Sequence, residues 1–386
     1  MKAKSIKGKS PEDITSALRQ NTAEGFKPNL AIVFISVKQD RKAVCEILSK
    51  EGIDVFGATS CGEFTDGYQA EGSIAILLFE IPKDCYAILF EEIGNSDLKE
   101  VGRQVALAAL KKFGNPSLIL CSTGLNAKGE FFDGSTLVQS VKETLGSDRS
   151  FFGGMAGDDM TFTGSYVFTQ EKETDFGIAA IVFDADKISM FGMAITGWKP
   201  MGIARTVTKS NGNKVFTIDN ISAVEMYFKY LGKEEKKADH DFKVFEELGF
   251  TYPFITEREP GGDMMLKTPL KIDHEENALE IDMEMPEGTK FWFSMPPDFD
   301  IVDEILNEAT HLKNSNQSDA DALLIFSCAG RQPVLGPLVT AENDGLADLW
   351  KTPMAGFFTY GEYGRTKKGK QEFHSGACCW VALKEK

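Results

Sequence analysis

The stretch Leu30–Val37 (LAIVFISV) is a short apolar run that ends in small residues. The stretches Ser117–Ser122 (SLILCS) and Ala322–Cys328 (ALLIFSC) have the same texture. Runs this short and this continuously apolar are typical of strands that are covered on both faces of a sheet. After each run apolar residues recur at helical spacing, most weakly after the third. We therefore expect three units that each begin with a buried strand and a helix.

A glycine-rich turn that ends in an acidic residue follows in each unit. The turns are Phe56–Phe64 (FGATSCGEF), the shorter Phe152–Asp159 (FGGMAGDD) and Ala355–Tyr363 (AGFFTYGEY). A second apolar strand is expected after each turn, at Ser73–Phe79, Gly177–Phe183 and Gly376–Leu383. The order strand, helix, turn, strand thus occurs three times with variable spacing. This order predicts an internally repeated α/β unit, not a solenoid of fixed period.

The residues between the second and third units have a different character. Helical patterns run through Ile221–Leu231, which Gly232 would end, and through Ile301–Leu306. We expect a hairpin at Leu279–Ser294 with its turn at Pro286–Gly288. A domain boundary near residue 203 gives modules 1–202, with two units, and 203–386, with one unit plus the inserted hairpin and helices. The predicted fold class is α/β, with mixed sheets flanked by helices and two closely packed modules.

Composition limits the classes of function. The chain has 386 residues, with 42 Lys and Arg against 58 Asp and Glu, and a net charge of −16. This charge disfavours nucleic acid and anionic membranes as main partners. The N-terminal residues contain no apolar signal segment, and the apolar runs are much shorter than the roughly 18 residues of a membrane span. Seven scattered cysteines indicate reduced thiols. We therefore expect a cytoplasmic protein without a membrane span.

The ordered set of motifs resembles the FIST proteins, a family of sensory domains with an N-terminal and a C-terminal module. The resemblance rests on Val55–Glu63, Phe151–Asp158, Thr196–Trp198, Phe326–Arg331, Gly356–Glu362 and Phe373–His374. It implies a signal-input protein that binds a small ligand, with amino acids proposed for the family, and some relatives bind haem and sense nitric oxide. The sequence contains no recognisable output segment. We therefore expect output through a separate protein, such as a kinase or a chemoreceptor pathway component.

The residues themselves suit a small zwitterion. Ligands of α/β folds gather at the carboxyl ends of strands, and glycine turns let backbone N–H groups approach a ligand closely. Arg331 could hold a carboxylate, Glu63 and Glu362 an ammonium group, and Tyr360 could form an aromatic wall. The ligand-binding candidates are Ser60, Cys61, Gly62, Glu63, Cys328, Arg331, Tyr360, Gly361 and Glu362. We expect the pocket between the modules, where Glu63 and Arg331 would converge, and no catalytic residue or metal site.

Other interpretations remain open at this point. The Gly-Glu turns could be purely structural, with each Glu paired to a nearby Lys, and Arg331 could brace two loops by capping carbonyl groups. Cys328 could simply fill a tight strand end. A haem-binding sensor would use His374 as axial ligand. An enzyme would combine Cys61 or Cys328 with His374 and a Glu.

Overall fold

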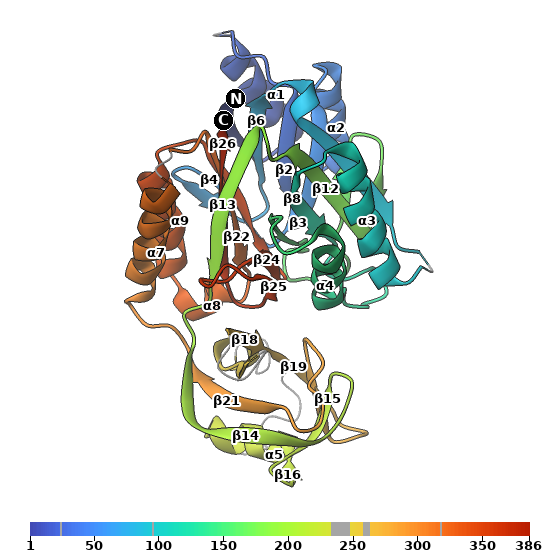
Figure 1. Cartoon of the computed structure of the whole chain (residues 1–386), viewed down its shortest axis with the longest axis vertical. Coiled ribbons are helices and arrows are strands. Elements are labelled where there is room, and N and C mark those ends of the chain that lie inside the picture. The colour runs from blue at the N-terminus through green and yellow to red at the C-terminus, as the bar shows by residue number, and fades with distance from the viewer. Residues whose placement is uncertain (24, 95, 233–247, 258–262, 317–318) are drawn as a thin grey trace.

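The computed structural model describes the whole chain except residues 24, 95, 233–247, 258–262 and 317–318. The described residues form a mixed α/β fold with three six-stranded sheets, one eight-stranded sheet and helices that pack on them. Figure 1 shows the three six-stranded sheets together, with the eight-stranded sheet below them. We call residues 1–198 and 296–386 the body, and residues 199–295 the second lobe.

The body contains the three six-stranded sheets. In hydrogen-bonded order, the first sheet is β1 (Lys2–Gly8), β6 (Ile74–Glu80), β2 (Leu30–Ser36), β3 (Asp54–Ser60), β10 (Val167–Thr169) and β11 (Glu173–Thr174). The second is β25 (Gln371–His374), β24 (Glu362–Arg365), β9 (Phe151–Met155), β8 (Pro116–Ser122), β12 (Gly177–Asp184) and β7 (Tyr86–Glu92). The third is β13 (Ile188–Ile195), β26 (Cys378–Glu385), β22 (Ala322–Cys328), β23 (Met354–Thr359), β4 (Glu63–Thr65) and β5 (Tyr68–Ala70).

The three sheets share one strand pattern. A parallel pair lies at the centre of each, namely β2 with β3, β8 with β9, and β22 with β23. The first member of each pair also binds an antiparallel strand, β6, β12 or β26. The three expected buried strands and the strands after the turns are therefore confirmed within a few residues. Descent of the three units from one ancestor stays a prediction.

Each glycine turn carries the chain from one sheet to another. The hairpin β4–β5 follows β3 of the first sheet but pairs with β23 of the third. The hairpin β10–β11 follows β9 of the second sheet but pairs with β3 of the first. The hairpin β24–β25 follows β23 of the third sheet but pairs with β9 of the second. The three hairpins thus form a cycle: the first sheet's hairpin joins the third sheet, the second sheet's joins the first, and the third sheet's joins the second. As a result, the second and third sheets each contain strands from before and after residue 203.

One central core lies between the three sheets, and helices cover their outer faces. Alternating residues of β2 show why the run is continuously apolar: Ile32 and Phe34 belong to the central core, whereas Val33 and Ile35 face the helices. The covering helices are α1 (Pro11–Thr22) and α2 (Arg41–Lys50) on the first sheet, α3 (Leu98–Lys112) and α4 (Gly134–Leu145) on the second, and α7 (Ile301–Asn316) and α9 (Leu338–Trp350) on the third. The short η1 (Lys83–Cys85) and α8 (Arg331–Leu335) complete the body.

The helix ends follow the local sequence. The hydroxyl group of Ser10 accepts a hydrogen bond from the backbone N–H of Asp13 at the start of α1, as its position before Pro11 predicts. The chain after α2 turns at Gly52, which has a φ of 74°, a conformation that glycine adopts without strain. The expected helices after the first and second strands are therefore confirmed.

The second lobe is built on the eight-stranded sheet. Its strands are β18 (Met264–Lys267), β17 (Phe254–Glu257), β21 (Lys290–Met295), β14 (Lys199–Asn211), β15 (Lys214–Ile218), β20 (Ala278–Ile281) and β19 (Pro269–Asp273), with β16 (Ile221–Ser222) paired to β15. The helix α5 (Ala223–Tyr230) packs on this sheet, where the helical pattern predicted it. The boundary expected near residue 203 falls inside β14.

The expected hairpin at Leu279–Ser294 does not form. Its turn exists, because the backbone N–H of Thr289 donates to the carbonyl of Pro286 at 3.0 Å. However, β20 pairs with β15 and β19, whereas β21 pairs with β14 and β17. The physical reason is that both edges of each strand are already occupied, because β20 lies between β15 and β19 and β21 lies between β17 and β14.

Candidate ligand-binding site

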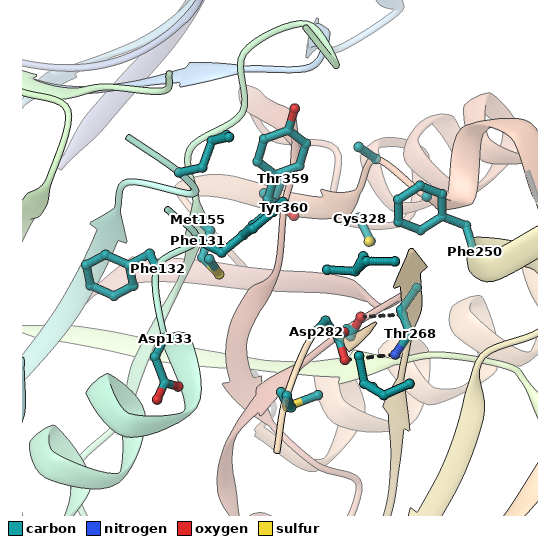
Figure 2. Close-up of a pocket in the computed structure, with 18 of the residues that line it drawn as sticks. Phe131, Phe132, Asp133, Met155, Phe250, Thr268, Asp282, Cys328, Thr359 and Tyr360 are labelled. Carbon is teal, nitrogen blue, oxygen red and sulfur yellow. Dashed lines mark hydrogen bonds between the residues drawn. The ribbon is translucent and has the colours of Figure 1, made fainter. Parts of the chain in front are cut away.

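A pocket of about 350 Å³ lies between the body and the second lobe (Figure 2). The body lines it with loops that follow β8, β9, β22 and β23, which are the members of two parallel pairs. The second lobe lines it with residues around β19 and β20 and with Phe250. The pocket therefore lies at the carboxyl ends of parallel strands, where ligands of α/β folds usually bind.

Aromatic rings and methionine side chains contribute nine of the 25 residues that line the pocket. The aromatic residues are Phe131, Phe132, Phe162, Phe250, Tyr360 and Phe373. Phe131 is 51% exposed. Its ring lies 6.4 Å from that of Phe162, which stacks on Tyr360 at 5.8 Å. The apolar wall thus extends to the outer surface of the body.

The loop that carries Phe162 has an uncommon backbone. Asp159, Met160 and Phe162 have φ values of 56°, 57° and 54°. Non-glycine residues rarely adopt this conformation, and such strain tends to persist at functional sites. Met160 and Phe162 line the pocket, so the surrounding structure holds strained residues against the candidate ligand site.

The polar groups of the pocket centre on Asp282. A carboxylate oxygen of Asp282 accepts a hydrogen bond from the backbone N–H of Thr268 at 2.8 Å, and the two residues also pair through the Asp282 N–H (Figure 2). The hydroxyl groups of Thr268 and Ser375 lie 3.3 Å apart beside them. Burial raises the pKa of Asp282 to about 6. The pocket therefore contains one partly desolvated carboxyl group in a largely apolar wall.

Two of the predicted site residues line this pocket, Cys328 and Tyr360. The hydroxyl group of Tyr360 donates to the carboxylate of Asp158, which also accepts the backbone N–H groups of Thr163 and Gly164. Burial raises the pKa of Tyr360 far above its ordinary value, so the hydroxyl group stays protonated. Tyr360 therefore presents its ring to the pocket and uses its hydroxyl group to hold the loop of Asp158.

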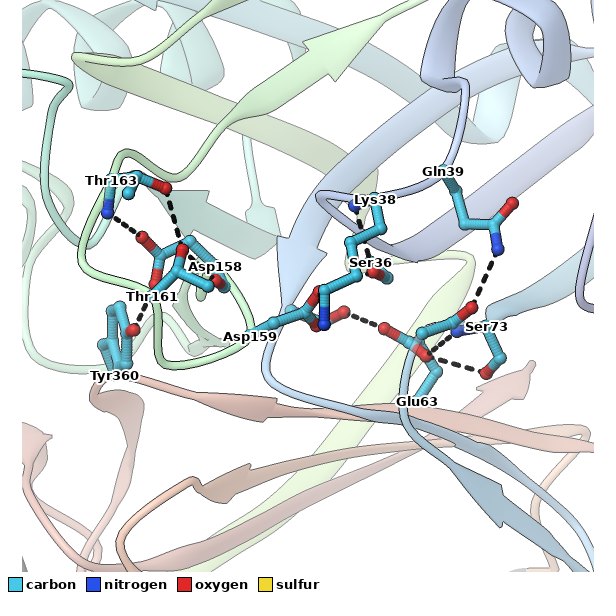
Figure 3. Close-up of polar contacts among 12 residues, drawn as sticks. Ser36, Lys38, Gln39, Glu63, Ser73, Asp158, Asp159, Thr161, Thr163 and Tyr360 are labelled. Carbon is cyan, nitrogen blue, oxygen red and sulfur yellow. Dashed lines mark hydrogen bonds and ion pairs between the residues drawn. The ribbon is translucent and has the colours of Figure 1, made fainter.

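Glu63 and Glu362 lie outside the pocket and hold equivalent positions in the fold. Glu63 accepts from the hydroxyl group of Ser60 and from the backbone N–H and the hydroxyl group of Ser73, directly before β6 (Figure 3). Glu362 accepts from Thr359 and from the backbone N–H of Ala377, directly before β26. Each Glu therefore connects an exchanged hairpin to the start of a strand in the neighbouring sheet.

The two glutamates are fully buried, and this changes their acidity. Burial raises the pKa of Glu63 to about 7 and that of Glu362 to about 8. Their partners are hydroxyl and backbone N–H groups, in place of the lysine that the structural interpretation of the turns assumed. Desolvation opposes the charged form more strongly than these hydrogen bonds favour it.

Arg331 is also fully buried and does not line the pocket. Its guanidinium group binds both carboxylate oxygens of Glu342, and it donates to the carbonyl oxygens of Thr196 at 2.7 Å and Gly376 at 2.8 Å. No hydrogen bond or ion pair joins it to Glu63. The geometry is thus that of a brace between two loops, the alternative that the sequence left open.

The remaining candidates, from the first and third turns, form hydrogen bonds within the body. Ser60 binds Glu63, and the backbone N–H of Cys61 donates to Phe358 at 2.9 Å. Gly62 has a φ of 126°, a value that side chains disfavour. Gly361 accepts the N–H of Met155 through its carbonyl group at 2.8 Å. These residues belong to the turns by which the chain passes from one sheet to the next, and they do not line the pocket.

A second polar cluster, around Asp159, lies where the turns meet, and no sequence motif marked it. One oxygen of Asp159 accepts from the hydroxyl group of Ser36 at 2.6 Å and lies 3.4 Å from the ammonium group of Lys38 (Figure 3). The other oxygen is buried without a hydrogen-bond partner, and the side chain is 5% exposed. The negative charge of Asp159 also helps to raise the pKa of Glu63.

The haem and enzyme alternatives depended on His374 and on reactive thiols. His374 directs a ring nitrogen to the carbonyl oxygen of Gly364 at 3.4 Å, while its neighbours Phe373 and Ser375 line the pocket. It therefore does not fit as the axial ligand of a haem group in this pocket. Burial raises the pKa of Cys61 to about 12 and raises that of Cys328 well above its ordinary value, which opposes formation of a nucleophilic thiolate. Among the described residues, no cluster of three His, Cys, Asp or Glu side chains could hold a metal ion.

Several pocket residues escaped prediction because they lie in loops or in the second lobe. Thr268 and Asp282 are distant in sequence from every glycine turn, and only tertiary structure brings them to Tyr360. One local signal was present: Phe131 and Phe132 are adjacent aromatic residues outside any strand, directly before Asp133, which caps α4. Aromatic pairs in a loop need an explanation beyond strand burial.

Comparison with known protein families assigns residues 29–221 to the FIST N domain and residues 223–365 to the FIST C domain. The chain therefore belongs to the FIST family, whose domains are sensory or signalling domains, as the motifs indicated. A search of curated proteins finds no match. Within the described part of the chain, no helix has the length and apolar character needed to cross a membrane.

Proposed function

We propose that this protein is a sensor that binds a small metabolite in the pocket between the body and the second lobe. The observation that carries the proposal is the pocket itself, a space of about 350 Å³ lined in part by aromatic rings, with the buried carboxyl group of Asp282 among its polar groups. Its volume falls within the range of small-molecule sites. The sensory character of FIST domains supports this interpretation.

The amino-acid hypothesis takes a specific form in this pocket. The ring of Tyr360 and its aromatic neighbours would contact an apolar side chain, and Asp282 would accept hydrogen bonds from the amino group. Cys328 would contact the ligand at the end of β22. Arg331 is engaged with Glu342, so another group would have to bind the α-carboxylate.

Output would pass through a separate protein. Because the pocket walls come from both the body and the second lobe, a ligand between them would stabilise one relative position of the two parts. A kinase or a chemoreceptor pathway component that binds one position more tightly than the other would then report ligand occupancy. The differential affinity of the ligand for the two positions limits the size of this response.

Native mass spectrometry of protein purified from its host tests the proposal. We expect a bound small molecule that is lost when the pocket is filled by Leu270→Trp, at a partly exposed position of the pocket wall. The matched control is Leu107→Trp, at a position that is 39% exposed on α3, outside the pocket. Equal retention of the molecule by both variants would reject the pocket as the binding site.

A further inference from the structure

The charged groups that line the pocket are unevenly balanced. They comprise three carboxylates, Asp133, Glu280 and Asp282, and one ammonium group, that of Lys271. Lys271 lies 3.1 Å from Glu280 and forms an ion pair with it. The cationic charge of the lining is therefore already matched, and two carboxylates remain without a cation among the lining residues.

The two remaining carboxylates, Asp133 and Asp282, differ in their hydrogen bonds and in their burial. Asp133 caps α4 and accepts hydrogen bonds from the backbone N–H and the hydroxyl group of Thr136. Asp282 accepts a backbone N–H from Thr268, and burial disfavours its negative charge. Lys267, on neighbouring β18, moderates that charge but directs its ammonium group to the carbonyl of Glu284. Asp282 is thus the carboxylate that gains most from a cation placed in the pocket.

The apolar wall also favours a cation. Phe131, Phe162 and Tyr360 form a continuous series of rings, joined by contacts of 6.4 and 5.8 Å between centroids. The faces of aromatic rings attract ammonium groups, and three methionine side chains, Met155, Met160 and Met283, add polarisable sulfur atoms. An anion would face these rings and Asp282, and Lys271, the one ammonium group among the described lining residues, is already paired with Glu280.

We propose that the pocket selects an organic cation, a protonated amine with an apolar or aromatic body, over the corresponding anion or zwitterion. This inference rests on the proposed function and narrows it, because a free α-carboxylate would oppose binding. The amine would lie between Asp282 and the ring series, and the body of the ligand would contact Phe250 and Phe373 in the remaining apolar wall.

Isothermal titration calorimetry with four matched compounds tests this selection. The compounds are phenethylamine, 2-phenylethanol, 3-phenylpropionate and phenylalanine, which share the phenyl group and differ in charge. We expect phenethylamine to bind at least tenfold more tightly than each of the other three. Equal or tighter binding of phenylalanine or 3-phenylpropionate would overturn the cation proposal while supporting the pocket as a small-molecule site. Absence of binding by all four at 10 mM would also overturn it.

Two substitutions test whether Asp282 and Phe131 produce the preference of the pocket for the amine. Asp282→Asn retains an acceptor for Thr268 and should weaken phenethylamine binding at least tenfold while changing that of 2-phenylethanol less than twofold. The control Asp186→Asn, on the exposed turn between β12 and β13, should change neither. Phe131→Leu, at a half-exposed position, should weaken the amine more than the alcohol, and this test remains available if Asp282→Asn does not fold. Equal effects on amine and alcohol in both variants would contradict the proposal.

Discussion

The ring of Phe162 stacks on the ring of Tyr360, with centroids 5.8 Å apart and an angle of 5° between the planes. Phe162 belongs to the loop after β9, whereas Tyr360 belongs to the turn after β23. Their contact therefore joins the turns of the second and third units at the pocket wall. The bond from the Tyr360 hydroxyl group to Asp158 reinforces the same junction. The same side chains therefore stabilise the turns that lead from one sheet to the next and determine the shape of the pocket.

Removal of the Tyr360 hydroxyl group should separate these two roles. In Tyr360→Phe, the buried carboxylate of Asp158 loses one donor, while the ring that stacks on Phe162 remains. We expect the free energy of unfolding to fall by about 1–3 kcal/mol, the usual cost of an unsatisfied buried polar group. Urea denaturation followed by fluorescence would measure it.

Tyr68→Phe provides the control, because the hydroxyl group of Tyr68 has no hydrogen-bond partner within the described residues. Its free energy of unfolding should stay within about 0.5 kcal/mol of the native value. Equal losses in the two variants would show that the Tyr360–Asp158 bond contributes nothing specific.

The buried glutamates should make stability fall as pH rises. Burial raises the pKa of Glu63 from an ordinary 4.5 to about 7 in the folded protein. Between these values the folded state retains a proton that the unfolded state releases, so this contribution is complete below pH 4.5 and is lost as pH rises through 7. Glutamine mimics the protonated form. Glu63→Gln should therefore remove about 2.5 kcal/mol of the fall in the free energy of unfolding between pH 5 and pH 8.

Denaturation curves at pH 5, 6, 7 and 8 would give this dependence. Glu362→Gln should act in the same direction over a window that reaches about pH 8. Glu51→Gln, at the exposed end of α2, should keep the native pH dependence. A Glu63→Gln variant as sensitive to pH as the native protein would indicate that Glu63 is ionised throughout.

The exchanged hairpins require glycine at the strands that receive them. Gly57 lies opposite Phe168 in the pairing of β3 with β10, and a Cβ atom on Gly57 would lie 2.2 Å from the Phe168 ring. Gly57→Ala should lower the free energy of unfolding by about 1–3 kcal/mol through overpacking. Phe168→Leu in the same chain should restore part of that loss.

The control is Gly114→Ala, at a position where a Cβ atom would have no neighbour within 4 Å. A double-mutant cycle between Gly57→Ala and Phe168→Leu should give a favourable coupling energy. Strict additivity would mean that the Phe168 ring moves away at no cost, and that glycine is required there for another reason.

Sequence patterns predicted the strands well where burial alone determines them. Leu30–Ser36 is covered on both faces, so its apolar run specifies a strand whatever its neighbours are. The exchange of hairpins could not be predicted in this way. Phe64 and Phe168 are aromatic residues that follow similar turns, and nothing in their local sequence says which sheet each will join. Their partners, Gly356 and Gly57, lie in other units of the chain.

The candidate site was partly predictable for a related reason. Cys328 and Tyr360 were found because the carboxyl ends of strands and the glycine turns are visible in the sequence. Asp282 and Thr268 were missed because their significance comes from the approach of the second lobe to the body. Glu63 and Glu362 occupy matching positions of two predicted turns, but a sequence cannot show whether a buried carboxylate faces a ligand or a backbone N–H.

The two interpretations of Arg331, a group that binds a ligand carboxylate and a brace between two loops, predict different effects of its replacement. In Arg331→Met, Glu342 would remain as a buried carboxylate without its cation, and we expect a loss of about 3–5 kcal/mol in the free energy of unfolding. Replacing both residues, in Arg331→Met with Glu342→Leu, should recover part of this loss, since only the carbonyl groups of Thr196 and Gly376 would then lack a donor. Because Arg331 does not line the pocket, the double variant should bind the pocket ligand within about threefold of the native affinity, an energetic difference below 1 kcal/mol. Calorimetry on the folded double variant would measure this affinity, and complete loss of binding would show that the guanidinium group holds the ligand after all.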